Sequence, residues 1–269
     1  MIKNLSLSFL VLSVLIGFGG SLPETAKAST VVSLSSVESG DLIRGESFSA
    51  VYYLGEDGFR YVFPNDKTYF TWYENFDSVK WLSDTDMGTI QIGGNVTYRP
   101  GVKMVKINSD TKTYAVGTNG ALHWVTTEEV AKGLYGSEWN KMIDDIPDGF
   151  FSNYQTNSDW NIENASEFDV SYVKSLSPTI NADKSLEEPS IISISEDGFV
   201  PNGITVSAGA VIRFENTGSE KHTATGEDLS WGTGTIQPGG SFSRYFEEAG
   251  TYPFFDTYNE SLSGAIYVQ

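Results

Sequence analysis

Alternating apolar residues mark out short strands over residues 190–269 of the chain. The apolar positions lie two apart, which is the period of a strand with one buried face. Turns rich in Gly, Pro and Asn separate these stretches, and no long helical period intervenes. The alternating pairs are Ile192 and Ile194, Ile204 and Val206, Ile212 and Phe214, and Ile266 and Val268. The pattern predicts a small antiparallel β-sandwich over residues 190–269.

The N-terminal half contains an internal repeat, which is seen when its first part is aligned with its second. Residues 42–44 then fall on 104–106, residues 52–58 on 114–120, and residues 61–63 on 123–125. Each unit is predicted to run strand, turn, strand, short helix, strand. Asp57-Gly58 and Asn119-Gly120 are strong hairpin turns, because Asp, Asn and Gly tolerate positive φ.

Polar residues indicate where the short helix of each unit begins. Asn65 or Asp66 is a suitable N-cap in the first unit, and Thr126 or Thr127 in the second. Each unit is too small to bury much core alone, so the two are expected to pack together. We therefore predict one two-unit repeat domain over residues 35–154, divided at about 35–97 and 98–154.

Two other segments differ in composition from these domains. Residues 155–189 are rich in Ser, Asn, Asp and Glu, and are predicted to form a partly ordered linker. Residues 1–28 have a basic start, a short apolar run and small residues at Ala26 and Ala28. This pattern predicts a secretory signal peptide cleaved after Ala28, and the run is shorter than the roughly 20 residues of a membrane span. No later segment is expected to span a membrane.

Charge and rare residues exclude several classes of function. The formal net charge is −18, which disfavours binding to nucleic acid or anionic lipid. The chain has no Cys, so thiolate metal sites and disulfide chemistry are excluded. His123 and His222 are the only histidines. His123 aligns with Tyr61 in the repeat and is expected to pack on a strand.

Part of the repeat is similar to a module of exported proteins from poorly characterised bacteria. The similar line is residues 51–64, Val-Tyr-Tyr-Leu-Gly-Glu-Asp-Gly-Phe-Arg-Tyr-Val-Phe-Pro. The resemblance implies an exported, non-catalytic module and no settled activity.

The C-terminal segment resembles the cupredoxin family, the small blue-copper proteins. The similar motifs are residues 198–201, 204–209, 212–216, 222–223, 249–255 and 264–268. The resemblance implies that the fold is mainly β, with a cupredoxin-like Greek-key sandwich at the C-terminal end after a β-rich repeat domain with short helices. It also places His222 at the first copper ligand, and puts Asp256, Asn259 and Leu262 where the family carries Cys, His and Met.

A type 1 copper site needs two imidazoles and a thiolate, usually with a weak axial thioether. One ligand of four survives in this chain. The expected site is therefore degenerate, with no metal and no cofactor, and His222 holds a loop, bonded to Asp256. The alternative is a copper-binding or electron-transfer protein with an altered site at His222 and Asp256.

No motif points to catalysis, so we expect no enzyme and no catalytic residue. We predict an exported structural or interaction protein that is secreted or lies on the outer face of the cell envelope. Its partner is expected to be an extracellular or envelope component, which the sequence does not identify. Several aromatic residues of the repeat domain are candidates for a ligand surface, although core packing is the expected role of most: Tyr52, Tyr53, Tyr69, Trp72, Tyr73, Trp124 and Trp139.

Overall fold

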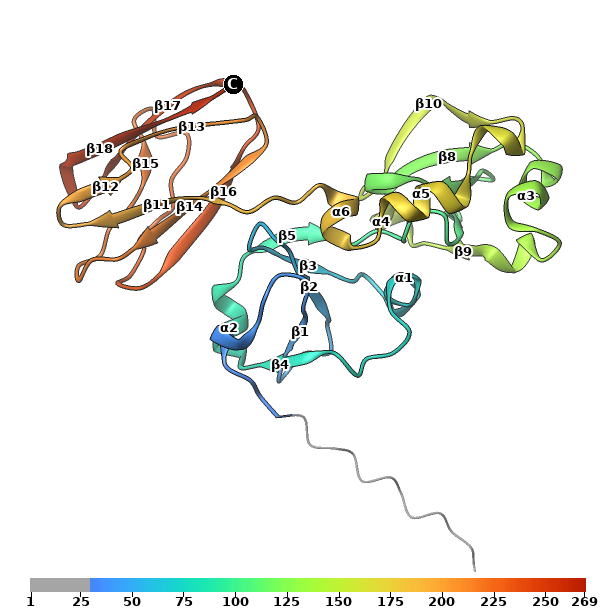
Figure 1. Ribbon diagram of the computed structural model, residues 1–269, viewed down its shortest axis with the longest axis horizontal. Helices are drawn as coiled ribbons and strands as arrows, with labels where there is room; N and C mark the ends of the chain where they lie inside the picture. Colours follow the sequence, from blue (N-terminus) through green and yellow to red (C-terminus); the bar gives the residue numbers. More distant parts are fainter. Residues whose placement is uncertain (1–29) are drawn as a thin grey trace, which may run out of the picture. The chain divides into compact units, whose positions relative to one another are not determined.

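The computed structural model describes residues 30–269, so the signal peptide predicted at 1–28 lies outside the described residues. Residues Val31–Gln269 form one unit by their contacts, and this unit contains four sheets (Figure 1). Within residues 30–269, none of the helices has the length and apolar character needed to cross a bilayer.

The first sheet has five strands in the order β4-β1-β2-β3-β5. A hairpin joins β2 to β3, and the turn between them contains Gly58 at φ 80°. The elements are η1 (Leu34–Ser36), β1 (Leu42–Gly45), β2 (Tyr52–Leu54), β3 (Arg60–Val62), α1 (Asp66–Trp72), β4 (Lys80–Leu82), α2 (Asp84–Thr89) and β5 (Ile92–Asn95).

The second sheet repeats this arrangement, with five strands in the order β10-β8-β7-β6-β9. Its strands β6 to β10 take the places of β1 to β5 in turn, as the internal repeat predicts. The elements are β6 (Met104–Lys106), β7 (Thr113–Val116), η2 (Thr118–Gly120), β8 (Ala121–Val125), α3 (Glu128–Tyr135), η3 (Trp139–Met142), β9 (Ile143–Asp145), α4 (Asp148–Phe151) and β10 (Gln155–Ile162).

The helix starts follow the predicted capping residues. Asn65 caps α1, its side chain accepting from the Thr68 N–H at 2.8 Å. Thr127 caps α3 in the same way, accepting from the Val130 N–H at 3.2 Å. Gly136 ends α3 at φ 79°, a conformation that glycine adopts without a steric cost.

Residues 155–189 differ from the predicted partly ordered linker. Their first part is β10, which pairs with β8 and completes the second sheet. The elements η4 (Ala165–Glu167), α5 (Val170–Leu176) and α6 (Ile180–Lys184) follow. Ile162 and Phe168 pack in the core of the second unit, and Ile180 in that of the first. The composition misled the prediction because β10 is an edge strand with mostly exposed side chains.

The C-terminal domain is a sandwich of two four-stranded sheets. One has the order β12-β11-β14-β16 and the other β13-β18-β17-β15, and Ile192, Phe214, Phe254 and Ile266 are fully buried in the core between them. The strands are β11 (Ser190–Ser195), β12 (Gly198–Val200), β13 (Gly203–Val206), β14 (Ala210–Asn216), β15 (Thr225–Gly226), β16 (Ser241–Phe246), β17 (Gly250–Asp256) and β18 (Asn259–Val268).

Two pairings in this sandwich differ from the antiparallel arrangement that was predicted. β11 pairs with β14, and β13 with β18, in parallel. Alternation of apolar residues shows that one face of a strand is buried, but it carries no information on the direction of the neighbouring strand.

Side chains of the first repeat unit contact strand β16 of the sandwich. Tyr245 donates to the buried carboxylate of Asp57, and Tyr61 donates to the same oxygen at 2.5 Å. Gln91 and Ser243 exchange two hydrogen bonds of 3.0 and 2.7 Å. The first repeat unit and the sandwich therefore share a polar contact that is partly buried.

Candidate functional site

His222 lies on the segment that follows β14, held by backbone bonds to another part of the same loop region. Its N–H donates to the Ile236 carbonyl at 3.1 Å, and its carbonyl accepts from the Ile236 N–H at 2.8 Å. Asn216, at the end of β14, donates to the carbonyls of Glu220 and Ile236. These bonds fix the backbone of His222, and its side chain is buried, with 4% exposed.

Asp256 ends β17 and is fully buried beside His222. One carboxylate oxygen lies 2.7 Å from His222 Nδ1. The other accepts from the Thr223 N–H at 2.9 Å, the Thr223 hydroxyl at 3.2 Å and the Tyr258 N–H at 3.0 Å. Four donors around one carboxylate satisfy its hydrogen-bonding capacity, as a buried charge requires. The predicted bond between His222 and Asp256 is confirmed.

The other two positions of the copper motif have structural roles in the β17–β18 hairpin. Asn259 lies opposite Asp256 in the register, and its side-chain oxygen accepts from the N–H and hydroxyl of Ser261 at 3.2 and 2.6 Å. Leu262 packs against the core of the sandwich. The tight hairpin therefore keeps the motif spacing, while Asn259 bonds within its own strand.

These residues do not fit a type 1 copper ion. The chain has no Cys, and therefore no thiolate to offer at the position where the resemblance places Asp256. The Nδ1 atom of His222 is taken by the carboxylate, and residues 30–269 contain no group of three or more His, Asp or Glu side chains arranged to hold a metal. His222 Nε2 is buried and has no hydrogen-bond partner among the described residues. One remaining nitrogen without a second ligand is far from the set that copper requires.

Several residues that no sequence pattern identified add hydrogen bonds around His222 and Asp256. The Thr223 hydroxyl accepts from the Thr257 N–H at 2.8 Å and lies 3.1 Å from the Thr257 hydroxyl. Glu196 accepts from the Ser219 N–H at 2.7 Å and from the Glu220 N–H at 2.9 Å. Hydrogen bonds from its own N–H, then from Ser219 and Glu220, lower the pKa of Glu196 to about 2. Threonines and a single acid near a turn carry no pattern that would have marked them in the sequence.

His123 lies on β8 in the second repeat sheet, as its alignment with Tyr61 predicts. Its ring stacks on Trp160 with centroids 5.4 Å apart, and lies tilted by 50° against Phe168 with centroids 5.0 Å apart. Burial lowers the pKa of His123, which favours the neutral imidazole. An aromatic packing role accounts for these contacts.

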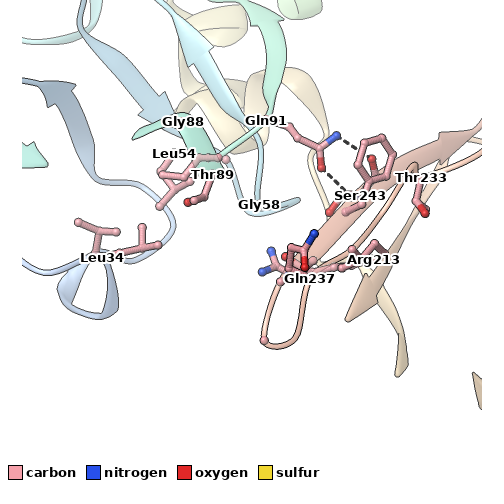
Figure 2. A pocket seen from close by; sticks show the side chains of 18 of the residues that line it. Leu34, Leu54, Gly58, Gly88, Thr89, Gln91, Arg213, Thr233, Gln237 and Ser243 are labelled. Carbon is pink, nitrogen blue, oxygen red and sulfur yellow. Dashed lines mark hydrogen bonds between the residues drawn. The ribbon is translucent and has the colours of Figure 1, made fainter. Parts of the chain in front are cut away.

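A cleft of about 740 Å³ lies where the first repeat unit meets the sandwich. Figure 2 shows Gln91 and Ser243 bonded to each other at its edge, with Arg213 nearby. The guanidinium of Arg213 is paired with Glu215 at 2.9 Å, so its charge is compensated within the protein. The cleft therefore offers mainly small polar and apolar side chains and gives no support to a catalytic site.

A family model described as a cupredoxin-like domain matches residues 173–268, and the chain therefore contains a cupredoxin-like domain. The match begins within α5, in the segment expected to be a linker. No curated protein matches the chain.

Several solved structures resemble about 30% of the chain. A purple cupredoxin from Nitrosopumilus maritimus is 18% identical, with a TM-score of 0.28 over 30% of this chain and 99% of its own. A mutant of amicyanin with Cu(I) is 19% identical, with a TM-score of 0.28 over 30% of this chain and 82% of its own. A copper-containing nitrite reductase from Thermus scotoductus SA-01 is 18% identical, with a TM-score of 0.29 over 30% of this chain and 22% of its own.

Proposed function

We propose that this chain is an exported, non-enzymatic structural or interaction protein whose cupredoxin-like domain has lost type 1 copper binding. The observation that carries the proposal is the 2.7 Å contact between His222 Nδ1 and the buried carboxylate of Asp256. A carboxylate with four donors stands where the family motif has a copper thiolate, and it holds the imidazole of His222 at Nδ1. The domain then serves as a stable scaffold, and the interaction function belongs to the surface of the molecule.

The extracellular setting rests on the signal-like pattern of residues 1–28. The expected mature chain begins at Ser29 and is found in the medium or on the outer face of the envelope. Intact-mass measurement of the protein isolated from its host tests this part of the proposal. A chain that keeps residues 1–28 and stays in the cytosol would contradict it.

A second candidate is the altered copper site at His222 and Asp256. The observation in its favour is the unpaired Nε2 of His222, a nitrogen that is free to ligate. Two observations oppose it. The Nε2 atom of His222 is buried. The other imidazole of the chain, that of His123, lies on β8 in a different sheet.

Titration with Cu(II) decides between the two candidates. The purified chain from Ser29 is titrated by calorimetry and by EPR, beside His222→Ala and its matched control His123→Ala. We expect only weak binding that is the same in all three proteins. Stoichiometric binding of submicromolar affinity that is lost in His222→Ala and kept in His123→Ala would overturn the proposal.

A further inference from the structure

Two surface grooves occupy equivalent positions in the two repeat units. The first groove, of about 460 Å³, is lined by residues 49–51 and 62–66 with Tyr69, Phe76, Asn95 and Phe150. The second groove, of about 350 Å³, is lined by residues 111–113 and 124–128 with Ala131 and Trp139. All residues of the second groove except Trp139 align in the repeat with residues that line the first, so the two units share a surface feature as well as a fold.

The same three elements frame each groove. The first lies where the chain enters β2, leaves β3 and begins α1, and the second where it enters β7, leaves β8 and begins α3. The capping residues Asn65 and Thr127 stand at corresponding points of the two rims. Since neighbouring strands and a capped helix hold the walls, the grooves are formed in the absence of a ligand.

An exposed aromatic ring forms part of the first groove. Phe76 stacks on the buried Tyr69 with centroids 4.3 Å apart and an angle of 23° between the rings. Phe70 also lies against Phe76, with centroids 5.3 Å apart and 67° between the rings, and 48% of Phe76 is nevertheless exposed. A large apolar side chain that stacks on a buried ring and is half exposed at a groove is typical of a ligand platform.

The second groove also carries aromatic rings. Trp139 follows helix α3 as Phe76 follows α1, and Trp124 lines the wall opposite the helix start. Lys112 Nζ lies 4.5 Å from the centroid of the Trp124 ring, which keeps a mobile cation over that face. Both grooves therefore combine aromatic surface with hydroxyl groups and a single carboxylate. The first groove adds the amides of Asn65 and Asn95, and the second adds the ammonium group of Lys112.

We propose that the two grooves bind pyranose rings of a neutral polysaccharide. Pyranoses with equatorial substituents present C–H groups on their faces, which pack on aromatic rings, while their hydroxyls bond to polar groups at the rim. The net charge of −18 disfavours an anionic polymer. A polymer presents the same ring repeatedly, and a protein with the same groove twice gains affinity when both are filled.

This inference supplies a partner class for the interaction protein proposed above, and it rests on that function for its extracellular setting. The two can fail separately. Loss of copper is decided by the titration with Cu(II), which does not involve the grooves, and polysaccharide binding is decided by the assays that follow.

The test uses the chain from Ser29 with cellohexaose and chitohexaose in calorimetry, and with insoluble cellulose and chitin in pull-down assays. We expect binding to at least one of the two sugars, and Phe76→Ala is expected to weaken it by about ten-fold through loss of the stacked ring. Phe48→Ala is the matched control, because Phe48 is 69% exposed and lies outside both grooves. Phe76→Tyr keeps the ring and is expected to retain binding.

The contribution of the second groove is read from the insoluble polymers. Trp139→Ala is expected to reduce retention on the polymer, since the polymer presents rings to both grooves at once. Thermal unfolding of each variant checks that the fold is kept.

Three results would overturn the proposal. One is the absence of binding to both sugars and both polymers. Another is equal binding by Phe76→Ala and Phe48→Ala. The third is a change of oligomeric state in Phe76→Ala, measured by sedimentation, which would assign the first groove to contact between copies of the chain.

Discussion

The contact between His222 and Asp256 couples the segment after β14 to the end of β17. The buried carboxylate of Asp256 fixes the imidazole of His222 at Nδ1, and the Nε2 atom is buried as well. Neither nitrogen is therefore exposed to a ligand from solvent. The Thr223 and Tyr258 backbone N–H groups complete the coordination of the carboxylate, so the same residue also closes the β17–β18 turn. Asp256 therefore joins two strands and a loop through one side chain.

Replacement of Asp256 tests this role. Asp256→Ala leaves a buried imidazole, the buried Thr223 N–H and the half-buried Tyr258 N–H without this acceptor, and the free energy of unfolding is expected to fall by about 3–5 kcal/mol. Urea denaturation followed by far-UV circular dichroism measures the change. Asp159→Ala, at an exposed position, serves as the control and is expected to stay within about 0.5 kcal/mol of wild type. Equal stabilities of the two variants would show that the pair does not hold the fold.

The carboxylate of Glu196 predicts a dependence on pH. Because the pKa of Glu196 is lowered from 4.5 to about 2 in the folded protein, its ionised form stabilises the fold above pH 4.5, and this contribution is lost as the pH falls through about 2. Glu196→Gln is therefore expected to be less stable than wild type at neutral pH and to match it near pH 2. Urea midpoints across this range measure the difference, with Glu187→Gln as the exposed control. A difference that stays constant down to pH 2 would contradict the assignment.

Much of the candidate site at this scale could be predicted from the sequence. The motif order identified His222 and Asp256, and two complementary side chains in that order favoured a hydrogen bond between them. Thr223, Thr257 and Glu196 could not be found, because their contacts depend on turns whose geometry is set by the rest of the fold.

At the scale of elements, the segment 155–189 is the main departure from expectation. Ser, Asn, Asp and Glu dominate its composition, which favoured a linker. Three of its apolar residues are nevertheless buried in the cores of the repeat units: Ile162 and Phe168 in the second unit, and Ile180 in the first. Residues 155–189 therefore have the composition of a linker but are folded onto the repeat units by a few buried side chains.

Two substitutions within residues 155–189 distinguish a buried core residue from a surface residue. Ile180 is fully buried on α6, whereas Leu176 on α5 is 46% exposed. Ile180→Ala is expected to lower the free energy of unfolding by about 2–5 kcal/mol, since it leaves a cavity. Leu176→Ala is expected to change it much less. Chemical denaturation of both variants measures this, and similar small effects would restore the interpretation as a linker.

Strand direction also belongs to this scale. The apolar alternation located four of the eight strands of the sandwich, β11, β13, β14 and β18, but did not show that they pair in parallel as β11–β14 and β13–β18. Direction depends on how the chain crosses between the two sheets, which is a property of the loops and of core packing.

At the scale of the whole molecule, the first repeat unit and the sandwich are linked through Asp57. Its buried carboxylate accepts from Tyr61 and Tyr245, and the two hydroxyls lie 2.8 Å apart. Burial, and then hydrogen bonding to Asp57, raise the pKa of both tyrosines, which keeps them protonated as donors. In the sequence Asp57 is only a hairpin residue, because its partner Tyr245 lies 188 residues away.

This contact predicts that the repeat unit and the sandwich stabilise each other. Tyr245→Phe removes a hydrogen bond to a charged group and is expected to lower the free energy of unfolding by about 1.5–3 kcal/mol. The double variant with Tyr61→Phe should be non-additive, because both hydroxyls bond to one oxygen. Tyr267→Phe, at a residue 44% exposed, is the control. Full additivity in a double-mutant cycle would show that the two tyrosines act independently.

The sequence by itself determined the alternating strands of the sandwich, the hairpin turns, the helix caps and the internal repeat of the N-terminal half, because each depends on patterns along the chain. It also determined the absence of a copper thiolate, since the chain has no Cys. Only the tertiary structure decided the parallel pairings, the burial of residues 155–189, the Asp57 contact and the alignment of the two grooves. These features depend on contacts between segments that are far apart in the sequence. Local periodicity shows that one face of a segment is buried, but it does not identify the distant segment that packs against that face.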